Sequence, residues 1–416
     1  MELKVRNVNE AFYKLVETFA EESRNRTVPV IKKDSRNGKV LMIDEPVTIT
    51  YSHPRERVLF NIERDANPFF HLYEALWMLA GRNDVESVAY YAKQMREYSD
   101  DGKRLNGAYG YRWRKATVDA GLSTHVELTS VDQLDVIVAH LKTNPTSRRA
   151  VLSMWNVEDD LLKIGGYGNR IRCKRCYGTG GVAIASQVVN DQGYDVIDCP
   201  NCKRSGWEDE PSSKDVCCNL NVMFSIREGE RVEDEHKYHP HTGTFYTTKK
   251  YLDMTVTNRS NDLIWGLLGA NYVHFTFLQE YLAARLGVEV GKYHHFTNNL
   301  HAYEWNWKPK EWLEGGYFAS YTPISGAESV VKPGVPINPS PSFEEELPYF
   351  VKRFGKNPYG ATSWNSKFLQ EAQNILLAYH YGYKNKSYST ANVYLDRIES
   401  EDWRIAAKTW LERRVK

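Results

Sequence analysis

The six cysteines of the chain fall into two sets that predict different chemistry. Four of them form two CxxC pairs: Cys173, Cys176, Cys199 and Cys202. Paired CxxC motifs can place four thiolates tetrahedrally around one Zn²⁺, and glycines on their flanks let backbone amides turn towards the sulfurs. Structural disulfides are the alternative interpretation. The spacing favours a structural zinc site.

The other two cysteines, Cys217 and Cys218, are adjacent in the segment VCCNLNVMF. Neither of these cysteines belongs to a CxxC pair, so neither thiol has a partner of that kind. As a thiolate, such a cysteine is both a good nucleophile and a good leaving group, and nearby cations would lower its pKa. The alternative is a buried structural thiol. We therefore look for arginines that the fold could bring to this segment.

Composition limits the classes of function. The 416 residues exceed what one hydrophobic core usually serves, so we expect a main domain with insertions or extensions. With 54 basic and 53 acidic residues, no global charge favours nucleic acid or a membrane, and any anion site must be a local arginine cluster. No long apolar run is present, and free thiols suit a reducing compartment, so we predict a soluble, non-secreted, cytoplasmic protein.

The N-terminal third shows alternating helix and strand patterns. We expect a helix over 8–22, then a polar loop over 33–40 and a strand pair over 40–44 and 47–51. Apolar residues at helical spacing predict a helix within 67–81, and Glu74 lies in the middle of it. A helix over 131–141 leads to an apolar run at 148–155 that predicts a buried strand.

The rest of the chain divides by composition. The Gly-, Cys- and Asn-rich stretch 157–211 lacks amphipathic pattern and is expected to hold the zinc insertion. Strands are predicted at 220–226 and 251–258, and a long buried helix at 271–288, stopped by Gly287. A Pro- and Gly-rich connector at 321–341 precedes predicted helices over the following ranges: 342–354, 367–381 and 400–414.

Five segments together resemble one enzyme family. NGAYGYRWR, SRRAVLSMWN, CNLNVMF, NRSNDLIWGLLGAN and NNLHAY have the order and approximate spacing of motifs in thymidylate synthases and the related nucleotide hydroxymethylases. The resemblance runs from about Asp34 to Tyr303, interrupted by the zinc insertion. It implies an α+β, three-layer subunit with a large twisted mixed β-sheet, which pairs back to back in a homodimer. It also implies 5,10-methylenetetrahydrofolate as one-carbon donor and dUMP as substrate.

The resemblance and the composition together suggest a division of the chain. The catalytic core is predicted at 1–165 and 207–341, the zinc-binding insertion at 166–206, and a helical extension at 342–416. In this family a cysteine adds to C6 of the pyrimidine and makes C5 nucleophilic. Cys218 matches that cysteine because Phe224 then falls where the family has a phenylalanine, whereas Cys217 takes the place of the usual proline. Cys217 remains the alternative nucleophile.

Phosphate recognition calls for forked, permanently charged guanidinium groups. Arg259 and Ser260 match phosphate ligands of the family, as does the pair Arg148 and Arg149, which in that family reaches into the partner subunit's site. Arg36 resembles a loop arginine that also binds phosphate, although Arg24 or Arg26 could take that role. Each arginine could instead be a solvated surface residue.

Three further positions match residues that bind the base, the sugar or the cofactor. Asn271 matches the residue that reads the pyrimidine, and an amide favours uracil over cytosine. The spacing from Asp262 to Asn271 is one residue longer than is usual, and capping of the following helix is the alternative role for the amide. His301 and Tyr303 match the pair that binds the sugar 3′ hydroxyl, and Asp262 matches the aspartate that holds the pterin.

Proton transfer needs an acid and a base near the ring. Glu74 matches the family's catalytic glutamate, and a carboxyl in an apolar helix is costly to bury without a role. The alternative is a surface glutamate at the edge of the helix. Tyr109 matches a tyrosine near C5.

Several departures from the family pattern affect the expected product. Asn219 replaces a histidine, Met223 replaces a glutamine, Met95 and Tyr98 lie nearest the positions of two tryptophans, and the chain ends in LERRVK instead of an apolar tail. With less shielding, the exocyclic methylene intermediate should meet water instead of hydride. We therefore expect 5-hydroxymethyl-dUMP. Reductive methylation to dTMP is the alternative, and a dCMP hydroxymethylase is a third possibility if Asn271 is misaligned.

A rival hypothesis makes the zinc module a docking element for nucleic acid or protein, with a degenerate enzyme behind it. Basic residues flank the CxxC pairs, which favours this hypothesis. Only Tyr177 and Trp207 add aromatic character, and the overall charge is balanced. We therefore do not expect nucleic acid as a partner.

Overall fold

The computed structural model describes residues 1–20, 29–119, 128–157, 159–164, 170–173, 175–185, 194–209, 213–233, 246–323 and 329–414. Arg24 and Arg26 lie outside these ranges.

The predicted α+β class is confirmed, because a six-stranded mixed sheet and a four-stranded sheet are combined with two groups of helices. None of the described helices has the length and apolar character needed to cross a membrane.

The six-stranded central sheet has the order β1–β4–β15–β13–β12–β7 and mixes parallel and antiparallel pairs. Its strands are β1 (Glu2–Val5), β4 (Val47–Tyr51), β7 (Val151–Ser153), β12 (Asn219–Glu233), β13 (Tyr246–Asn258) and β15 (Glu289–Thr297). One expectation is corrected. The run at 148–155 does not form a buried strand, because β7 is a short edge strand in which only Leu152 is buried.

The second sheet has the order β14–β16–β3–β2. It consists of β2 (Val30–Ser35), β3 (Gly38–Ile43), β14 (Asn261–Asp262) and β16 (Leu300–Tyr303). The segments 40–44 and 47–51, expected to pair with each other, belong to different sheets. Part of the polar stretch 33–40 forms β2 instead, and a two-residue turn at Arg36 and Asn37 joins β2 to β3. Turn formers at 36–38 thus close the hairpin, and Pro46 leads the chain from one sheet to the other.

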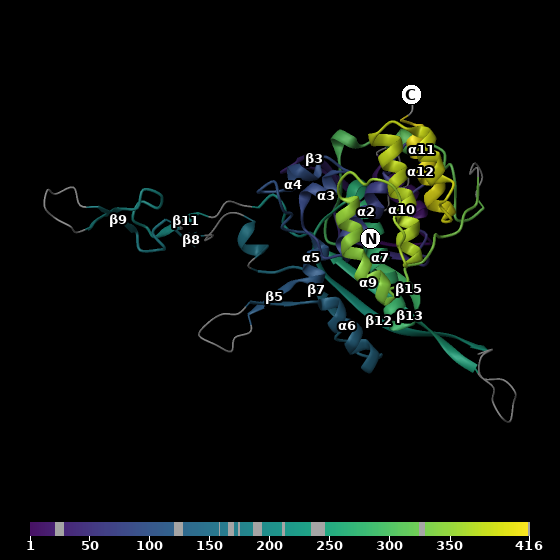
Figure 1. Cartoon of the computed structure of the whole chain (residues 1–416), viewed down its shortest axis with the longest axis horizontal. Coiled ribbons are helices and arrows are strands. Elements are labelled where there is room, and N and C mark those ends of the chain that lie inside the picture. The colour runs from purple at the N-terminus through teal and green to yellow at the C-terminus, as the bar shows by residue number, and fades with distance from the viewer. Residues whose placement is uncertain are drawn as a thin grey trace.

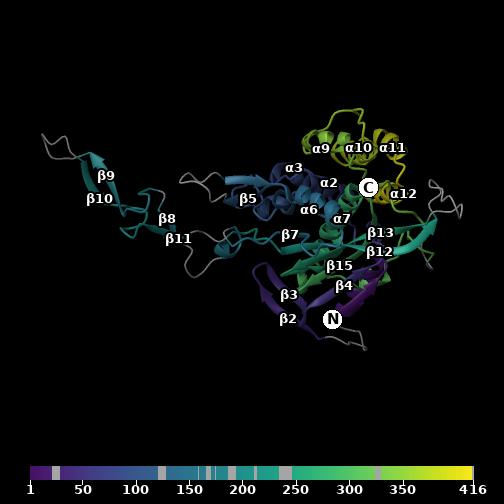
Figure 2. The ribbon, with the colours of Figure 1, turned by 90° about the horizontal axis from the view of Figure 1, so that it is seen from below.

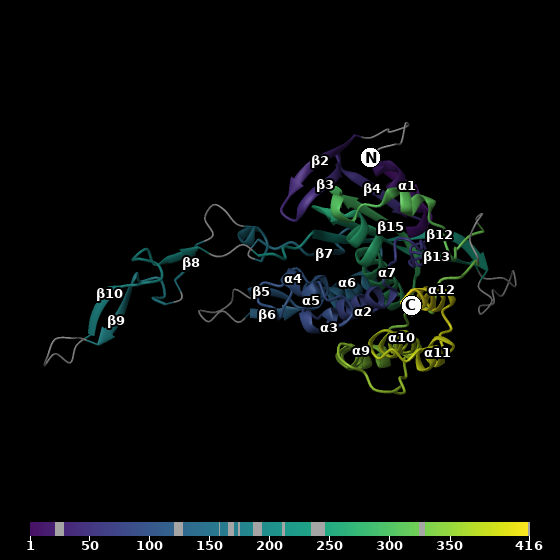
Figure 3. The same ribbon diagram turned by 90° about the horizontal axis from the view of Figure 1, so that it is seen from above.

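A layer of helices covers one face of the central sheet (Figure 3). Helix α7 packs on β13 and β15, and α2 packs on α7. The helices of this layer are α2 (Pro68–Leu79), α3 (Val85–Ala89), α4 (Met95–Tyr98), α5 (Tyr109–Arg114), α6 (Gln133–Thr143) and α7 (Asn271–Leu286). As predicted, Gly287 ends α7 in a left-handed conformation, with a φ of 70°. Helix α1 (Val8–Phe19) ends earlier than expected and packs on β3 and on α8 (Pro309–Glu314).

The C-terminal extension forms a further layer outside the first helices (Figures 2 and 3). It consists of α9 (Pro341–Phe354), α10 (Lys367–Tyr379), α11 (Tyr388–Leu395) and α12 (Glu401–Glu412). Three of these helices, α9, α10 and α12, pack on α2. The Phe69 ring of α2 lies 5.1 Å from Tyr379 and 5.4 Å from Trp410, and the Tyr73 hydroxyl donates to Val351 O at 2.8 Å. The extension therefore supports α2 from the side opposite α7.

The cysteine-rich insertion projects away from the rest of the molecule (Figure 1). It contains two antiparallel strand pairs, β8 (Arg170–Arg172) with β11 (Trp207–Asp209) and β9 (Gly181–Ala185) with β10 (Tyr194–Asp198). A separate hairpin is formed by β5 (Ala116–Asp119) and β6 (Leu128–Val131). Because β11 continues to Asp209, the strands of the insertion extend past residue 206. The exact division into domains remains a prediction.

Candidate active site

The two adjacent cysteines have different surroundings. Cys217 is buried, with 1% of its surface exposed, and its thiol donates to Asn219 O at 3.1 Å. Cys218 is partly exposed and immediately precedes β12. Its sulfur makes a long contact of 4.0 Å to Val216 O. Of the two cysteines, Cys218 is therefore the more accessible.

Two arginines lie against the segment that leads to Cys218. Arg259, just after β13, donates from Nε to Cys217 O at 2.9 Å and from Nη2 to Val216 O at 3.0 Å. Arg36, in the β2–β3 turn, donates from Nη2 to Lys214 O at 2.8 Å. Both are among the arginines that the sequence assigned to phosphate. They approach the segment before Cys218 from the ends of strands that belong to different sheets.

The charge around Cys218 is mixed. Burial raises the pKa of its thiol, Arg259 and Arg36 oppose this, and Asp215 adds to it. The pKa of the Cys218 thiol is raised overall. The sequence suggested that arginines could lower this pKa below its ordinary value, but Arg259 and Arg36 within one chain do not do so. Burial also raises the pKa of Asp215 itself, to about 6, although the Gly107 amide donates to it at 2.7 Å. The thiol is therefore predominantly protonated at neutral pH before a ligand binds.

Arg148 and Arg149 are not part of this cluster. Both side chains are exposed at the start of β7, and in the described part of the chain no hydrogen bond or ion pair links either guanidinium to the Cys218 segment. This placement is compatible with the expectation that they act in a partner subunit, which remains a prediction.

The residues expected at the sugar and the cofactor lie together on the second sheet. Ser260 Oγ is 3.5 Å from His301 Nδ1, and the His301 and Tyr303 rings are 5.3 Å apart. The Tyr303 hydroxyl also accepts a hydrogen bond of 3.4 Å from Asn37, beside Arg36. The phosphate and sugar candidates therefore form one continuous surface.

Asp262 lies at the edge of this surface. Its Oδ1 accepts hydrogen bonds from the backbone amides of Ile264 (2.7 Å) and Trp265 (2.5 Å), and within the described ranges Oδ2 accepts no hydrogen bond. Burial raises the pKa of Asp262 and lowers that of His301, and the two groups oppose each other's shift. Tyr98 is close enough to Tyr303 and Asp262 that they raise its pKa further, burial being the main cause.

The extra residue before Asn271 has a structural explanation. The segment Leu263–Ala270 is wound as a π-helix that is interrupted by a kink at Gly269 (φ −123°, ψ −122°). The backbone N–H of Asn271 donates to Gly266 O, five residues earlier. A π-helix accommodates one more residue per turn than an α-helix, and such turns are frequent at functional sites. The longer spacing therefore does not count against the assignment of Asn271.

A buried relay fixes the side chain of Asn271. Its Nδ2 donates to Asn261 Oδ1 at 3.2 Å, Asn261 Nδ2 lies 3.0 Å from His295 Nε2, and His295 Nδ1 lies 2.7 Å from the Tyr293 hydroxyl. Burial lowers the pKa of His295 to about 3, so this imidazole is neutral. The alternative role, capping of α7, is not observed, because no side chain caps that helix. The relay leaves Asn271 Oδ1 free to accept a hydrogen bond.

Both proton-transfer candidates, Glu74 and Tyr109, are buried. Glu74 is 5% exposed, which contradicts the alternative of a surface glutamate. The Tyr109 ring stacks on Phe275 at 5.7 Å, and burial, with Cys218 as the largest electrostatic contributor, raises its pKa. Asn219, which replaces the family histidine, is fully buried and donates to Thr257 O and Asn258 Oδ1.

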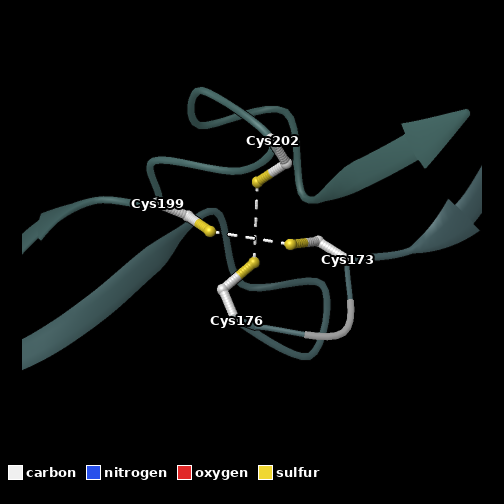
Figure 4. A group of neighbouring side chains, drawn as sticks. All are labelled: Cys173, Cys176, Cys199 and Cys202. Atoms are coloured by element: carbon white, nitrogen blue, oxygen red, sulfur yellow. Dashed lines mark hydrogen bonds between the residues drawn. The ribbon is translucent and has the colours of Figure 1, made fainter.

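The four CxxC cysteines converge in the insertion, where their sulfurs all lie within 4.8 Å of one another (Figure 4). The sulfurs of Cys173 and Cys199 are 3.5 Å apart and those of Cys176 and Cys202 are 3.6 Å apart. A disulfide would need about 2.05 Å. Sulfurs at the corners of a zinc tetrahedron with bonds of about 2.3 Å are separated by roughly 3.8 Å. The cluster therefore has the size of a zinc site and not of two disulfides.

Backbone geometry supports the same interpretation. The Gly180 amide donates to Cys176 Sγ at 3.3 Å. Gly180 and Gly206 have φ values of 80° and 76°, and a Cβ on either would lie 2.4 Å from a carbonyl oxygen of the other knuckle. Only glycine fits such a close approach in this conformation.

Comparison with known proteins extends these observations. A thymidylate synthase family model matches residues 61–164. A protein of Pseudomonas phage M6, named deoxyuridylate hydroxymethyltransferase, is 34% identical over 99% of this chain and 94% of its own length. This chain belongs to the thymidylate synthase family.

Two further relatives carry the same name. The protein of Bacillus phage SP01 is 30% identical over 64% of this chain and 51% of its own length. That of Delftia phage PhiW-14 is 25% identical over 65% of this chain and 56% of its own length. The match with the Pseudomonas phage protein spans nearly the whole chain and so includes the insertion and the extension.

Sequence reasoning missed several residues that the thymidylate synthase fold places at this site. His274 lies beside Glu74, and a histidine in the apolar run NYVHFTF could have been noted for the same reason as Glu74. Arg112 forms a buried ion pair with Asp160, whose Oδ1 accepts from the Cys217 amide at 2.9 Å. No sequence signal links these two residues, because Asp160 lies at the border of the insertion.

Proposed function

We propose that this chain is a deoxyuridylate hydroxymethylase, which transfers the one-carbon unit of 5,10-methylenetetrahydrofolate to C5 of dUMP and releases 5-hydroxymethyl-dUMP. The near full-length similarity to a phage protein of that name carries the proposal. The site supports it, because Cys218 is partly exposed and two arginines bind the segment that leads to it. In addition, Asn271 is held by Asn261 and carries an amide suited to uracil.

In this reaction the Cys218 thiolate attacks C6 of the pyrimidine and makes C5 a nucleophile. Arg259 and Arg36 would bind the phosphate, with Ser260 as a further donor. Arg259 and Arg36 already donate hydrogen bonds to the carbonyls of Val216 and Lys214. These bonds hold the two guanidiniums in place before the nucleotide binds. His301 and Tyr303 would bind the sugar hydroxyl.

Asn271 would select the base. The relay through Asn261 and His295 directs Asn271 Nδ2 inward to Asn261, so Oδ1 can accept from uracil N3–H while the second Nδ2 proton is donated to O4. Cytosine, which lacks a proton on N3, would leave Oδ1 without a donor. We therefore favour dUMP over dCMP.

The folate would lie beside Asp262, whose unused Oδ2 suits the N–H groups of a pterin. Trp265, which is 36% exposed and 5.4 Å from the Phe70 ring, offers an aromatic face nearby. When bound, this cofactor supplies the one-carbon unit at the oxidation level of formaldehyde. The protein supplies the orientation of the two reactants and the removal of the C5 proton, for which Glu74 and Tyr109 are the candidates.

A homodimer would complete the site. Arg148 and Arg149 are exposed, and the sheet face opposite the helices shows apolar side chains, with Val151 45% and Met223 40% exposed. Pairing of two such faces would cover these residues and bring the arginines of one subunit to the phosphate of the other. Their charges would also favour the Cys218 thiolate.

We further propose that the four-cysteine cluster holds one structural Zn²⁺, in keeping with a cytoplasmic protein whose thiols stay reduced. The purified chain should contain about one zinc per chain by elemental analysis, and Cys199→Ser should remove most of it. The Cys218→Ser variant is the matched control and should keep its zinc.

Thymidylate synthase is the second candidate, since the family model of that name matches part of the chain. An assay with dUMP and methylenetetrahydrofolate separates the two. We expect tetrahydrofolate and 5-hydroxymethyl-dUMP to form in equal amounts. Formation of dihydrofolate with dTMP would show reductive methylation instead, and no turnover of dUMP would refute both candidates.

A further inference from the structure

Several buried polar atoms beside Tyr109 have no hydrogen-bond partner among the described residues. They are Glu74 Oε2, both ring nitrogens of His274, and Trp113 Nε1. Glu74 is 5% exposed, His274 2% and Trp113 0%. Roughly 90% or more of buried polar groups are hydrogen-bonded to protein or water, so four orphan atoms in one place indicate a site built for water or ligand.

The geometry of this cluster suits a bound water. Glu74 Oε2 and His274 Nδ1 are 3.6 Å apart, too far for a direct hydrogen bond, but one water could lie within about 2.8 Å of both. The His274 ring is perpendicular to that of Tyr109, with centroids 5.4 Å apart, and 6.3 Å from that of Trp113. These rings surround the pair, and α2, α5 and α7 hold it from three sides.

The cluster adjoins the nucleophile. Tyr109 is near enough to Cys218 for the thiol to be the main electrostatic influence on its pKa after burial. His274 of α7 packs edge-on against the Tyr109 ring and lies beside Glu74 of α2, so Tyr109 connects the pair to the nucleophile. Asn219, which replaces the family histidine, cannot take the place of His274. Its side-chain amide donates to Thr257 O and Asn258 Oδ1, and it has no ring nitrogen.

We propose that His274, together with Glu74, holds the water that adds to the exocyclic methylene carbon of the nucleotide. This inference rests on the proposed function and explains how water is delivered. The water oxygen forms a bond to the methylene carbon, the C5=CH₂ electron pair moves to C5 and O4, and the C6–S bond then breaks to restore the Cys218 thiolate. The proton lost by the water passes to the Glu74–His274 pair. His274 is thus a positioning residue for the attack.

The test separates attachment of the one-carbon unit from its hydration. With dUMP tritiated at C5, release of tritium reports loss of the C5 proton, and product analysis reports hydration. For His274→Asn we expect tritium release within about threefold of the wild-type rate, but at least about tenfold less 5-hydroxymethyl-dUMP per tritium released. In the presence of 2-mercaptoethanol the missing product should appear as the 5-thioether, because a thiol adds to the same carbon without needing the bound water.

A matched control is His380→Asn in the extension. His380 is also 2% exposed, but both of its ring nitrogens have partners, Tyr90 and Asn385. This variant should give the wild-type ratio of product to tritium. The proposal is overturned if His274→Asn keeps the wild-type ratio, if tritium release and product fall together, or if His380→Asn shows the same loss. A wild-type enzyme that releases no tritium would refute the proposed function instead.

Discussion

At the scale of single residues, the two neighbouring thiols differ in burial and in the groups that surround them. Cys217 packs into the core, where its sulfur is a small apolar group with one hydrogen bond. Cys218 faces the arginines. We therefore propose separable roles for these adjacent residues of the same type, Cys217 in stability and Cys218 in chemistry.

We expect Cys218→Ser to lower turnover of dUMP by at least about 10⁴-fold, because a hydroxyl is a far weaker nucleophile and a poorer leaving group. It should also fail to form a covalent adduct with 5-fluoro-dUMP, measured by intact mass. Cys217→Ser is the control. It should form the adduct and lose only about 1 kcal/mol of stability, since its hydroxyl can still donate to Asn219 O. Adduct formation by the Cys218 variant would contradict the assignment.

The raised pKa of Cys218 predicts the pH dependence of its reactivity. Since burial and Asp215 favour the thiol, the thiolate fraction at pH 8 is lower than that of an ordinary cysteine and keeps rising above pH 9. Alkylation by iodoacetamide, followed on the Cys218 peptide by mass spectrometry, should show this rise. Arg36→Gln removes a cation that lowers the pKa and should slow alkylation at pH 8. A rate that levels off below pH 8 would refute the prediction.

How far the sequence could predict the site depends on the kind of residue. The cysteines, Arg259 and Glu74 could be found because each is a chemically distinctive residue in a motif or an apolar run. The role of Asn261 and His295 could not, since they lie 34 residues apart and meet only after β15 pairs with β13. Long-range hydrogen bonds leave no local pattern.

At the scale of elements, α2 and α5 are fitted to each other at one point. Gly110 in α5 lies so close to α2 that a Cβ would be 2.0 Å from Met78 O. The Gly110 amide also donates to Met78 Sδ at 3.1 Å. This contact sets the distance between the helix that carries Glu74 and the helix that begins with Tyr109.

We therefore expect Gly110→Ala to destabilise the protein by about 1–3 kcal/mol or more, because neither backbone can move without shifting a helix. Activity should fall further than stability alone explains, because Glu74 and Tyr109 would separate. Thermal unfolding and kcat would be measured on the same samples. Gly316→Ala, where a Cβ meets nothing within 4 Å, is the control and should behave as wild type.

Element types could mostly be predicted, whereas their pairing could not. The helix over 271–288 and the first and last helices of the extension are present because each has a long apolar stripe and clear ends. The helix α11 (Tyr388–Leu395) was not expected, since it is short and its pattern is weak. The wrong pairing of 40–44 with 47–51 arose because local spacing cannot tell which of two sheets a strand joins.

At the scale of the whole molecule, the proposed dimer predicts that inactive subunits can complement each other. A Cys218→Ser chain retains Arg149, and an Arg149→Glu chain retains Cys218. If the sites are shared, the mixed dimer has one intact site, so random exchange of equal amounts should restore about a quarter of wild-type activity. Mixing Cys218→Ser with Glu74→Gln is the control, because both residues lie on the same chain around one site. If the first mixture recovers no activity although native mass spectrometry confirms that subunits have exchanged, sharing through Arg149 is refuted.

The attachment of the last helices to α2 has a consequence for biosynthesis. Helix α12 follows α2 by roughly 300 residues, which a ribosome adds in on the order of 15–60 s at about 5–20 residues per second. During that interval the apolar side of α2 that later receives Tyr379 and Trp410 stays uncovered. Nascent chains should therefore depend on chaperones, and messages cut short within the extension should yield polypeptides that cellular proteases remove.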